Sequence, residues 1–169
     1  MVATHDHIEG LAEANAQLRR QYSEYATSVA ERLSTEFGEC FLVEHGNMAV
    51  CGIAEEGRAH CFHPHFLLIP SAELSTSPFV DYFGHDGCKF QSLIDAVNYG
   101  ADRGQYLLAG KITGPFHVFL PNGELPRQFA RALVAEQLGA SGRASWRDMP
   151  DLQWTANNAA ALRRVLKGL

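Results

Sequence analysis

The chain has 169 residues, of which 46% are hydrophobic and 20% are charged. This length predicts a single domain, residues 1–169, that buries a core without disulfides. The composition excludes a disordered chain, and no apolar run is long enough for a membrane-spanning helix. The polar N-terminal residues do not resemble a secretory signal. We therefore expect a cytoplasmic protein whose four cysteines are reduced.

The net charge of −5 is distributed unevenly along the chain. Residues 1–123 carry fifteen acidic and seven basic residues, whereas residues 124–169 carry four acidic and seven basic residues. Six of these last seven are arginines, among them Arg127, Arg131, Arg163 and Arg164. Because the chain as a whole is acidic, we expect this segment to face the acidic remainder of the fold or a partner subunit, and not nucleic acid.

The first predicted element is a long helix at residues 8–37. Its large or apolar side chains follow a 3-4-3-4 spacing: Ile8, Leu11, Leu18, Tyr22, Tyr25 and Val29. Asn15 completes the spacing at a heptad a-position, where asparagine fixes the register of paired helices. This pattern predicts a homodimer; the alternative is one amphipathic helix packed on the protein's own sheet. Gly38 should end the helix.

Three strands should follow, at residues 40–43, 48–53 and 59–69. The first two flank a hairpin turn at residues 45–47, His-Gly-Asn. Pro64 requires an edge position or a bulge in the third strand, because proline has no backbone N–H. Residues 70–87 are rich in glycine, proline and serine and predict a long loop, which inside a domain is often functional.

The remaining elements alternate between helix and strand. The pattern predicts a helix at 90–103, strands at 105–110 and 116–120, a helix at 126–139 and a last helix from residue 155. The order α-βββ-α-ββ-α-α indicates an α+β fold: an antiparallel sheet of about five strands with helices packed on it. Residues 38–123 form the sheet with one helix, and residues 124–169 form basic helices. This order is similar to that of the type III secretion chaperones, which are small acidic dimers.

Histidine and cysteine concentrate in two short runs of the chain. These runs hold five candidate metal ligands: Cys61, His63, His65, His85 and Cys88. Since side chains alternate along a strand, the first three should share one face. Thiolate and imidazole ligands favour zinc over magnesium or calcium, so we expect zinc if the site binds a metal. The alternative is a solvent-facing edge strand in which the cysteine is a small apolar residue.

Cys88 also admits a second interpretation, as the nucleophile of a cysteine-dependent hydrolase. The helix predicted at 90–103 would place Cys88 near its N-terminus, where a thiolate is stabilised. His117 and then Asn122 give the chain order of papain-like hydrolases. Residues 86–90 resemble the Asp-Gly-Asn-Cys-x-Phe stretch of ovarian-tumour-type deubiquitinases, but lack its Asn. The alternative is a helix cap with an incidental cysteine.

The chain lacks the motifs of a phosphate-binding loop, a serine nucleophile elbow and a zinc-protease helix. The acidic body and the long N-terminal helix favour a small cytoplasmic binding or regulatory protein that acts through protein–protein contacts as a homodimer. The alternative is a zinc-dependent or cysteine-dependent enzyme with its site at residues 61–88. Neither reading involves a membrane.

Overall fold

The computed structural model describes residues 1–5, 8, 10–47, 64–123, 125–126, 128–144 and 152–167. Within these ranges the helices are α1 (Ala16–Phe37), α2 (Ser77–Phe83), α3 (Leu93–Ala101), α4 (Phe129–Gln137) and α5 (Leu152–Val165). The strands are β1 (Val2–Ala3), β2 (Cys40–Gly46), β3 (His65–Pro70), β4 (Cys88–Phe90), β5 (Tyr106–Lys111) and β6 (Phe116–Phe119). A 3₁₀ turn, η2 (Ser141–Arg143), follows α4.

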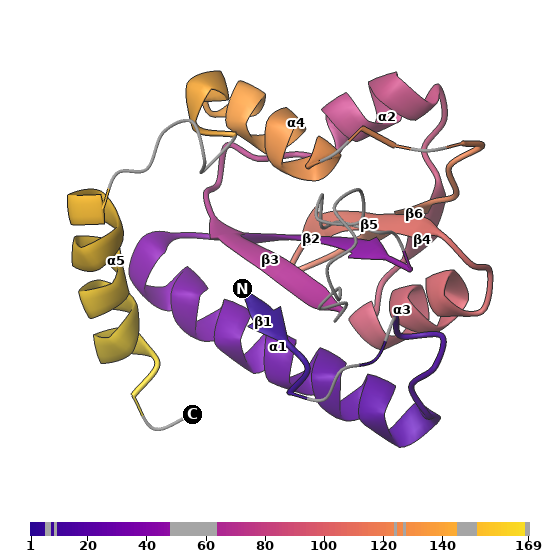
Figure 1. Ribbon diagram of the computed structural model, residues 1–169, viewed down its shortest axis with the longest axis horizontal. Coiled ribbons are helices and arrows are strands. Elements are labelled where there is room, and N and C mark those ends of the chain that lie inside the picture. Colours follow the sequence, from indigo (N-terminus) through magenta and orange to yellow (C-terminus); the bar gives the residue numbers. More distant parts are fainter. Residues whose placement is uncertain are drawn as a thin grey trace, which may run out of the picture.

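The strands form an antiparallel sheet in the order β1-β3-β2-β5-β6-β4. Helices α1 and α3 lie on one face of this sheet and α2 and α4 on the other, while α5 lies beside α1 (Figure 1). The predicted fold class, α+β with an antiparallel sheet, is therefore confirmed, with six strands in the described ranges. None of the described helices is long and apolar enough to cross a membrane.

Each face of the sheet has its own apolar core because side chains alternate along every strand. On β2, Leu42 packs in the core under α1 and α3, whereas Phe41 and Val43 pack in the core under α2 and α4. Nearly all residues of β2 and β5 are buried, as expected for central strands covered on both faces. The alternation therefore assigns each functional side chain to one of two separate layers.

Helix α1 begins at Ala16 and not at residue 8. Asn15 has extended backbone angles, and its side-chain Oδ1 accepts a hydrogen bond from the backbone N–H of Leu18 at 2.9 Å. Asn15 is therefore the N-cap of the helix, and its interpretation as a heptad a-position is wrong. Gly38, with a φ of +92°, ends the helix as predicted.

The apolar stripe of α1 packs on the protein's own sheet. Leu11, just before the helix, is fully buried, and Tyr22 and Val29 are each 5% exposed. The Tyr22 ring stacks on Phe66 of β3, with ring centroids 4.6 Å apart. Tyr25, by contrast, is largely exposed. Packing within one chain accounts for the spacing, so the homodimer stays a prediction that this stripe no longer supports.

Strand β2 is longer than predicted. His45 lies within it, opposite Leu107 of β5, so the hairpin turn predicted at residues 45–47 is wrong. The distant strand β5 is the partner that extends β2, and this long-range pairing overrides the local turn signal. The strand predicted at 48–53 and the part of the third strand before Pro64 lie outside the described residues.

Residues 70–87 are not a continuous loop, because α2 occupies Ser77–Phe83. Pro78 lies in the first turn of this helix, where a backbone N–H is not needed, and Gly84 ends the helix in the left-handed conformation. Phe79 is fully buried against the sheet. The serine, proline and glycine residues that suggested a loop therefore mark the two ends of a short helix.

Strand β4 occupies the position where the sequence predicts the start of a helix. Cys88 pairs with Val118 of β6, and α3 begins only at Leu93. The helix predicted at 90–103 therefore starts late, and Cys88 is not at a helix N-terminus. Residues 38–123 accordingly contain two helices, α2 and α3, instead of one.

The last helix is attached to the first. Arg32 of α1 donates hydrogen bonds to the backbone carbonyl oxygens of Val165 and Lys167 at 3.4 and 3.2 Å. Such carbonyl groups at a helix C-terminus lack partners within the helix and favour a cation. Val165 also contacts the core under α1. Helix α5, which starts at Leu152 and not at residue 155, is therefore part of the fold.

Replacing Asn15 by alanine should lower the free energy of unfolding by about 1 kcal/mol, because the Leu18 N–H loses its acceptor. Denaturation followed by circular dichroism measures this difference. Asn15→Asp keeps an acceptor oxygen and should remain close to the wild type. All three proteins should have the same mass by light scattering; a lower mass for Asn15→Ala alone would restore the heptad interpretation.

Candidate functional site

The predicted metal ligands do not come together in the described part of the chain. Cys61 and His63 lie outside the described residues. His65 is on β3 and Cys88 is on β4, and three strands separate them in the sheet. Four spacings of about 4.8 Å place these two strands about 19 Å apart. One metal site cannot include both His65 and Cys88.

His85 and Cys88 are separated by the sheet, although their spacing suits a shared metal. The His85 ring centroid lies 6.0 Å from that of Phe119, which belongs to the core under α2 and α4. Cys88 pairs with Val118, which belongs to the opposite core. The described residues contain no group of three histidine, cysteine, aspartate or glutamate side chains that could hold a metal. The zinc site therefore stays a prediction that depends on residues outside the described ranges.

Cys88 and His117 do not form the predicted pair of nucleophile and base. His117 lies opposite Lys89, the neighbour of Cys88, so the side chains of His117 and Cys88 point to opposite faces of the sheet. The Cys88 thiol donates instead to the Tyr99 hydroxyl at 2.9 Å. His117 Nδ1 lies 2.8 Å from the carbonyl oxygen of Asp86. The hydrolase interpretation thereby loses its proposed base.

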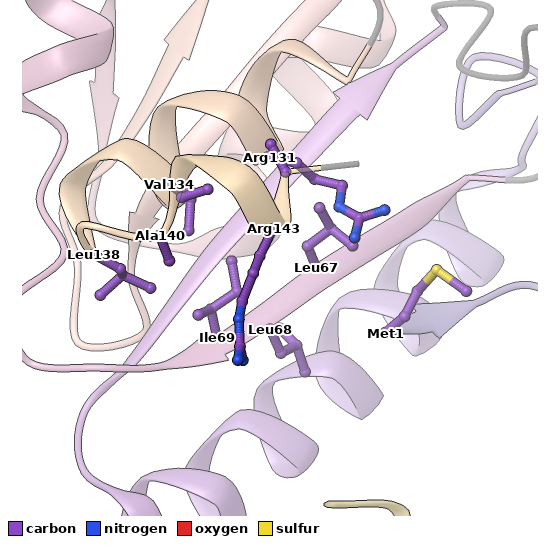
Figure 2. A pocket seen from close by; sticks show the side chains of 11 residues that line it. Met1, Leu67, Leu68, Ile69, Arg131, Val134, Leu138, Ala140 and Arg143 are labelled. Atoms are coloured by element: carbon purple, nitrogen blue, oxygen red, sulfur yellow. The ribbon is translucent and has the colours of Figure 1, made fainter. Parts of the chain in front are cut away.

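A groove of about 570 Å³ lies between α4, η2 and the outer part of β3 (Figure 2). Among the described residues that line it, nine are apolar and two are arginines, and none of these eleven is acidic. The residues that matter most for its chemistry are Leu67, Leu68, Ile69, Arg131, Val134 and Arg143. An apolar surface with guanidinium groups is suited to a ligand that is both apolar and anionic.

Helix α4 forms one wall of the groove and is fixed to the rest of the fold at both ends. Near its start, the Ala130 N–H donates to Nε2 of His45 on β2 at 3.2 Å. At its last residue, Gln137 accepts from the Ser75 N–H at 3.0 Å and donates to the Ser75 carbonyl oxygen at 3.2 Å. Between these ends Val134 is buried against the sheet. The wall is therefore formed before any ligand arrives.

The attachment at His45 requires a neutral imidazole, because a protonated ring has no acceptor nitrogen. Burial lowers the pKa of His45 to about 4, and the nearby His65 contributes to this shift. The ring is therefore neutral at neutral pH and can accept the hydrogen bond from Ala130. Protonation of the ring in acid would remove the acceptor for the Ala130 N–H, so the start of α4 loses this attachment as the pH falls toward 4.

Gly139 turns the chain from α4 into η2. Its φ is +61°, and the N–H groups of Gly139 and Ala140 donate to carbonyl oxygens of the last helical turn at 3.0 and 2.7 Å. This pair of bonds is a Schellman motif, which favours glycine at the left-handed position. The turn directs η2 back toward β3, where Arg143 extends into the groove (Figure 2).

The groove is positive although the whole chain carries a net charge of −5. Arg131 is half-buried and extends from α4 toward the part of β3 that holds Leu67 (Figure 2). It forms no ion pair with any other residue that the structure describes. Its charge is therefore available to an anionic group of a ligand.

A buried carboxyl group lies on the opposite face of the sheet. Glu44 is 1% exposed, and its Oε2 accepts a hydrogen bond from the Tyr106 hydroxyl at 2.8 Å. Among the described residues its Oε1 has no partner. Burial raises the pKa of Glu44 to about 8, so the group is mostly protonated at neutral pH. Enclosed in the core, this pair affects stability and offers no surface for a ligand.

Two glycines make room for the tyrosine that meets Glu44. A Cβ atom at Gly46 would lie 1.9 Å from the Tyr106 ring, and one at Gly100 would lie 2.6 Å from it. Any larger residue at either position would displace the ring and its hydroxyl. The spacing of β2, β5 and α3 thus depends on these glycines.

No family model matches this chain, and comparisons with curated proteins and with solved structures found no significant match. The similarities to the element order of type III secretion chaperones and to a stretch of ovarian-tumour-type deubiquitinases therefore transfer no function. The function has to be inferred from the geometry of the chain's own residues.

The sequence indicates one wall of the groove and misses the other. The apolar spacing of residues 126–139 predicts the helix that forms this wall, whereas the basic segment after residue 124 is expected to face the acidic remainder of the fold or a partner subunit. The other wall is the outer part of β3. The position of β3 beside the two-residue strand β1 is not encoded by any local sequence pattern. No histidine or cysteine is among the described lining residues, so the histidine and cysteine clusters of the sequence do not indicate the groove.

Cys88 should react faster than Cys40 with iodoacetamide at pH 8. Cys40 is fully buried, and burial raises the pKa of its thiol to about 11, whereas Cys88 is only half-buried. The reason is burial and not the helix N-terminus that the sequence suggested. Competitive alkylation read by mass spectrometry ranks the thiols, with urea-unfolded protein as the reference. Faster labelling of Cys40 in the folded protein would contradict its buried position.

Glu44→Gln should remove a decline of stability with rising pH. The folded pKa of about 8 lies above the ordinary value of 4.5, so the folded state binds the proton more tightly. The proton on Glu44 therefore contributes to the free energy of unfolding. This contribution is complete below pH 4.5 and is lost as pH rises to 8, at about 1.4 kcal/mol per pH unit. Urea denaturation at several pH values measures the difference between wild type and variant.

The matched control for Glu44 is Glu39, the residue directly before the same strand. Hydrogen bonds from Lys111 and Thr113 lower the pKa of Glu39, so Glu39→Gln should change the pH profile only below about pH 4.5. An unchanged slope between pH 4.5 and 8 in Glu44→Gln would show that Glu44 is not buried as described.

Proposed function

We propose that this protein is a small binding protein that acts through protein–protein contacts. The groove between α4, η2 and β3 receives a segment of the partner that carries apolar and acidic side chains. The observation that supports this is the described lining of the groove, which combines nine apolar residues with two arginines. Burial of apolar side chains supplies affinity, and charge-assisted hydrogen bonds to guanidinium groups select an acidic partner.

The groove has the size and the rigidity that binding requires. Its volume of about 570 Å³ admits several side chains and lies within the usual range of binding pockets. Helix α4 is held by His45 at one end and by Ser75 at the other. Because little has to be ordered when a partner arrives, less binding energy is lost to conformational entropy.

The alternative, an enzyme with its site at residues 61–88, has less support. The sheet separates Cys88 from His117 and from His85, and β3 lies far from β4. A zinc site in this region would depend on Cys61 and His63, which lie outside the described residues. The cytoplasmic location and the homodimer stay expectations from the sequence, and binding in the groove requires neither.

Selection from a random twelve-residue peptide library on phage tests the proposal. Peptides enriched on the immobilised protein should combine Asp or Glu with apolar residues. Arg131→Glu should weaken the binding of such a synthetic peptide by at least about tenfold, because one charge-assisted hydrogen bond is lost and a like charge is added. Fluorescence anisotropy measures the dissociation constants.

Arg20→Glu is the matched control, since Arg20 is an exposed residue of α1 outside the groove. It makes the same charge change and should leave the dissociation constant within about twofold. Equal losses in both variants would show that only net charge matters. Failure to enrich any acidic, apolar peptide would contradict the proposed function.

A further inference from the structure

The outer edge of β3 adjoins the groove, and the described residues cover this edge only in part. Strand β1 pairs with β3 at two positions, His65 and Phe66. Leu67–Pro70 extends beyond the last of these pairs. Three consecutive residues of this stretch line the groove, although neighbours on a strand point to opposite faces. The groove therefore runs along the edge of the strand and not over one of its faces alone.

The hydrogen bonds of β3 toward β2 are made by its odd-numbered residues. The Ser71 N–H donates to the carbonyl oxygen of Glu39 at 2.9 Å, which continues the register of β2 with β3. In an antiparallel pair the residues that bond to a given neighbouring strand alternate along the chain. Ile69 and Leu67 therefore direct their backbone groups toward β2.

The even-numbered residues of β3 direct their backbone groups outward. The Thr4 N–H donates to the carbonyl oxygen of Pro64 at 3.4 Å, on the outer side of the strand. Leu68 is the next outward residue beyond the β1 pairs, and Pro70 has no N–H to offer. The N–H and C=O of Leu68 are thus the donor and acceptor that an added strand would meet.

We propose that the partner segment binds as an additional β-strand on the outer edge of β3, with backbone hydrogen bonds to Leu68. This inference rests on the proposed function and specifies the conformation of the bound segment. Side chains two residues apart on that strand would point toward α4. Arg131 lies on that side beside apolar lining residues, so we expect one of these positions to carry an acidic side chain and the other an apolar one.

An extended segment fits this edge better than the other occupants do. A helix or a small amphipathic acid could fill the groove, but a helix uses its own backbone groups internally and neither could pair with Leu68 as a strand does. A second copy of this chain, paired edge to edge through β3, would bring the arginines of both grooves together. Like charges at such a self-pairing contact oppose it.

Amide hydrogen exchange measured by NMR tests the pairing, with the tightest-binding library peptide as the probe. Saturation with this peptide should slow exchange at Leu68 at least tenfold. The amide of Leu108, which lies in the centre of the sheet on β5, is the reference and should not change. In a second measurement, each peptide residue in turn is N-methylated. Strand pairing predicts that binding is lost at the residue opposite Leu68 and at the residue two positions away that faces the Pro70 carbonyl group, but not at the residue between them.

The outcomes separate this inference from the proposed function. If the peptide binds and Arg131→Glu weakens it, but Leu68 exchange and the N-methyl series show no strand pairing, the inference is overturned and the proposed function stands. Loss of binding at consecutive N-methylated residues would indicate a helix and also overturn it. Protection of Leu68 that grows with protein concentration without peptide would assign the edge to a second copy. If no acidic, apolar peptide is enriched, both fail.

Discussion

The alternation of side chains along strands that are covered on both faces decides which groups of this protein can meet. Consecutive residues of β2 show the effect, because His45 caps α4 on one face while Glu44 meets Tyr106 in the core on the other. The same rule separates Cys88 from His117, which a reading of the chain order had paired. Chemistry in this fold is therefore confined to one layer or to an edge of the sheet.

His45 and Glu44, two of the titratable groups of β2, oppose each other in their effect on stability. Folding lowers the pKa of His45 to about 4, so the contribution of this group to the free energy of unfolding is complete above pH 6.5 and is lost as pH falls to 4. Folding raises the pKa of Glu44 to about 8, so the contribution of this group is complete below pH 4.5 and is lost as pH rises to 8. Between pH 4.5 and 6.5 the two slopes have opposite signs and offset each other. A flat wild-type profile there would thus conceal two protonation effects.

Sequence patterns correctly predicted those helix ends and strands that depend on residues close together in the chain. Gly38 ends α1, and the pattern of residues 105–120 gives β5 and β6, because a cap or an alternating strand is encoded by near neighbours. Asn15 was misread because a cap and a heptad position accept the same residue type. Strand β4 and the groove depend on which distant strands become neighbours in the sheet, which no short pattern records.

The open edge of β3 is a liability that the fold manages with charge. An uncovered strand edge is a template for unwanted pairing, and proteins often place charged residues beside it. Here Arg131 and Arg143 stand over the edge and oppose pairing with a second copy of the same surface. In the binding that we propose, the guanidinium group of Arg131 also attracts the acidic side chain of the added strand. The same arrangement would then both oppose pairing of this edge with a second copy and select a partner.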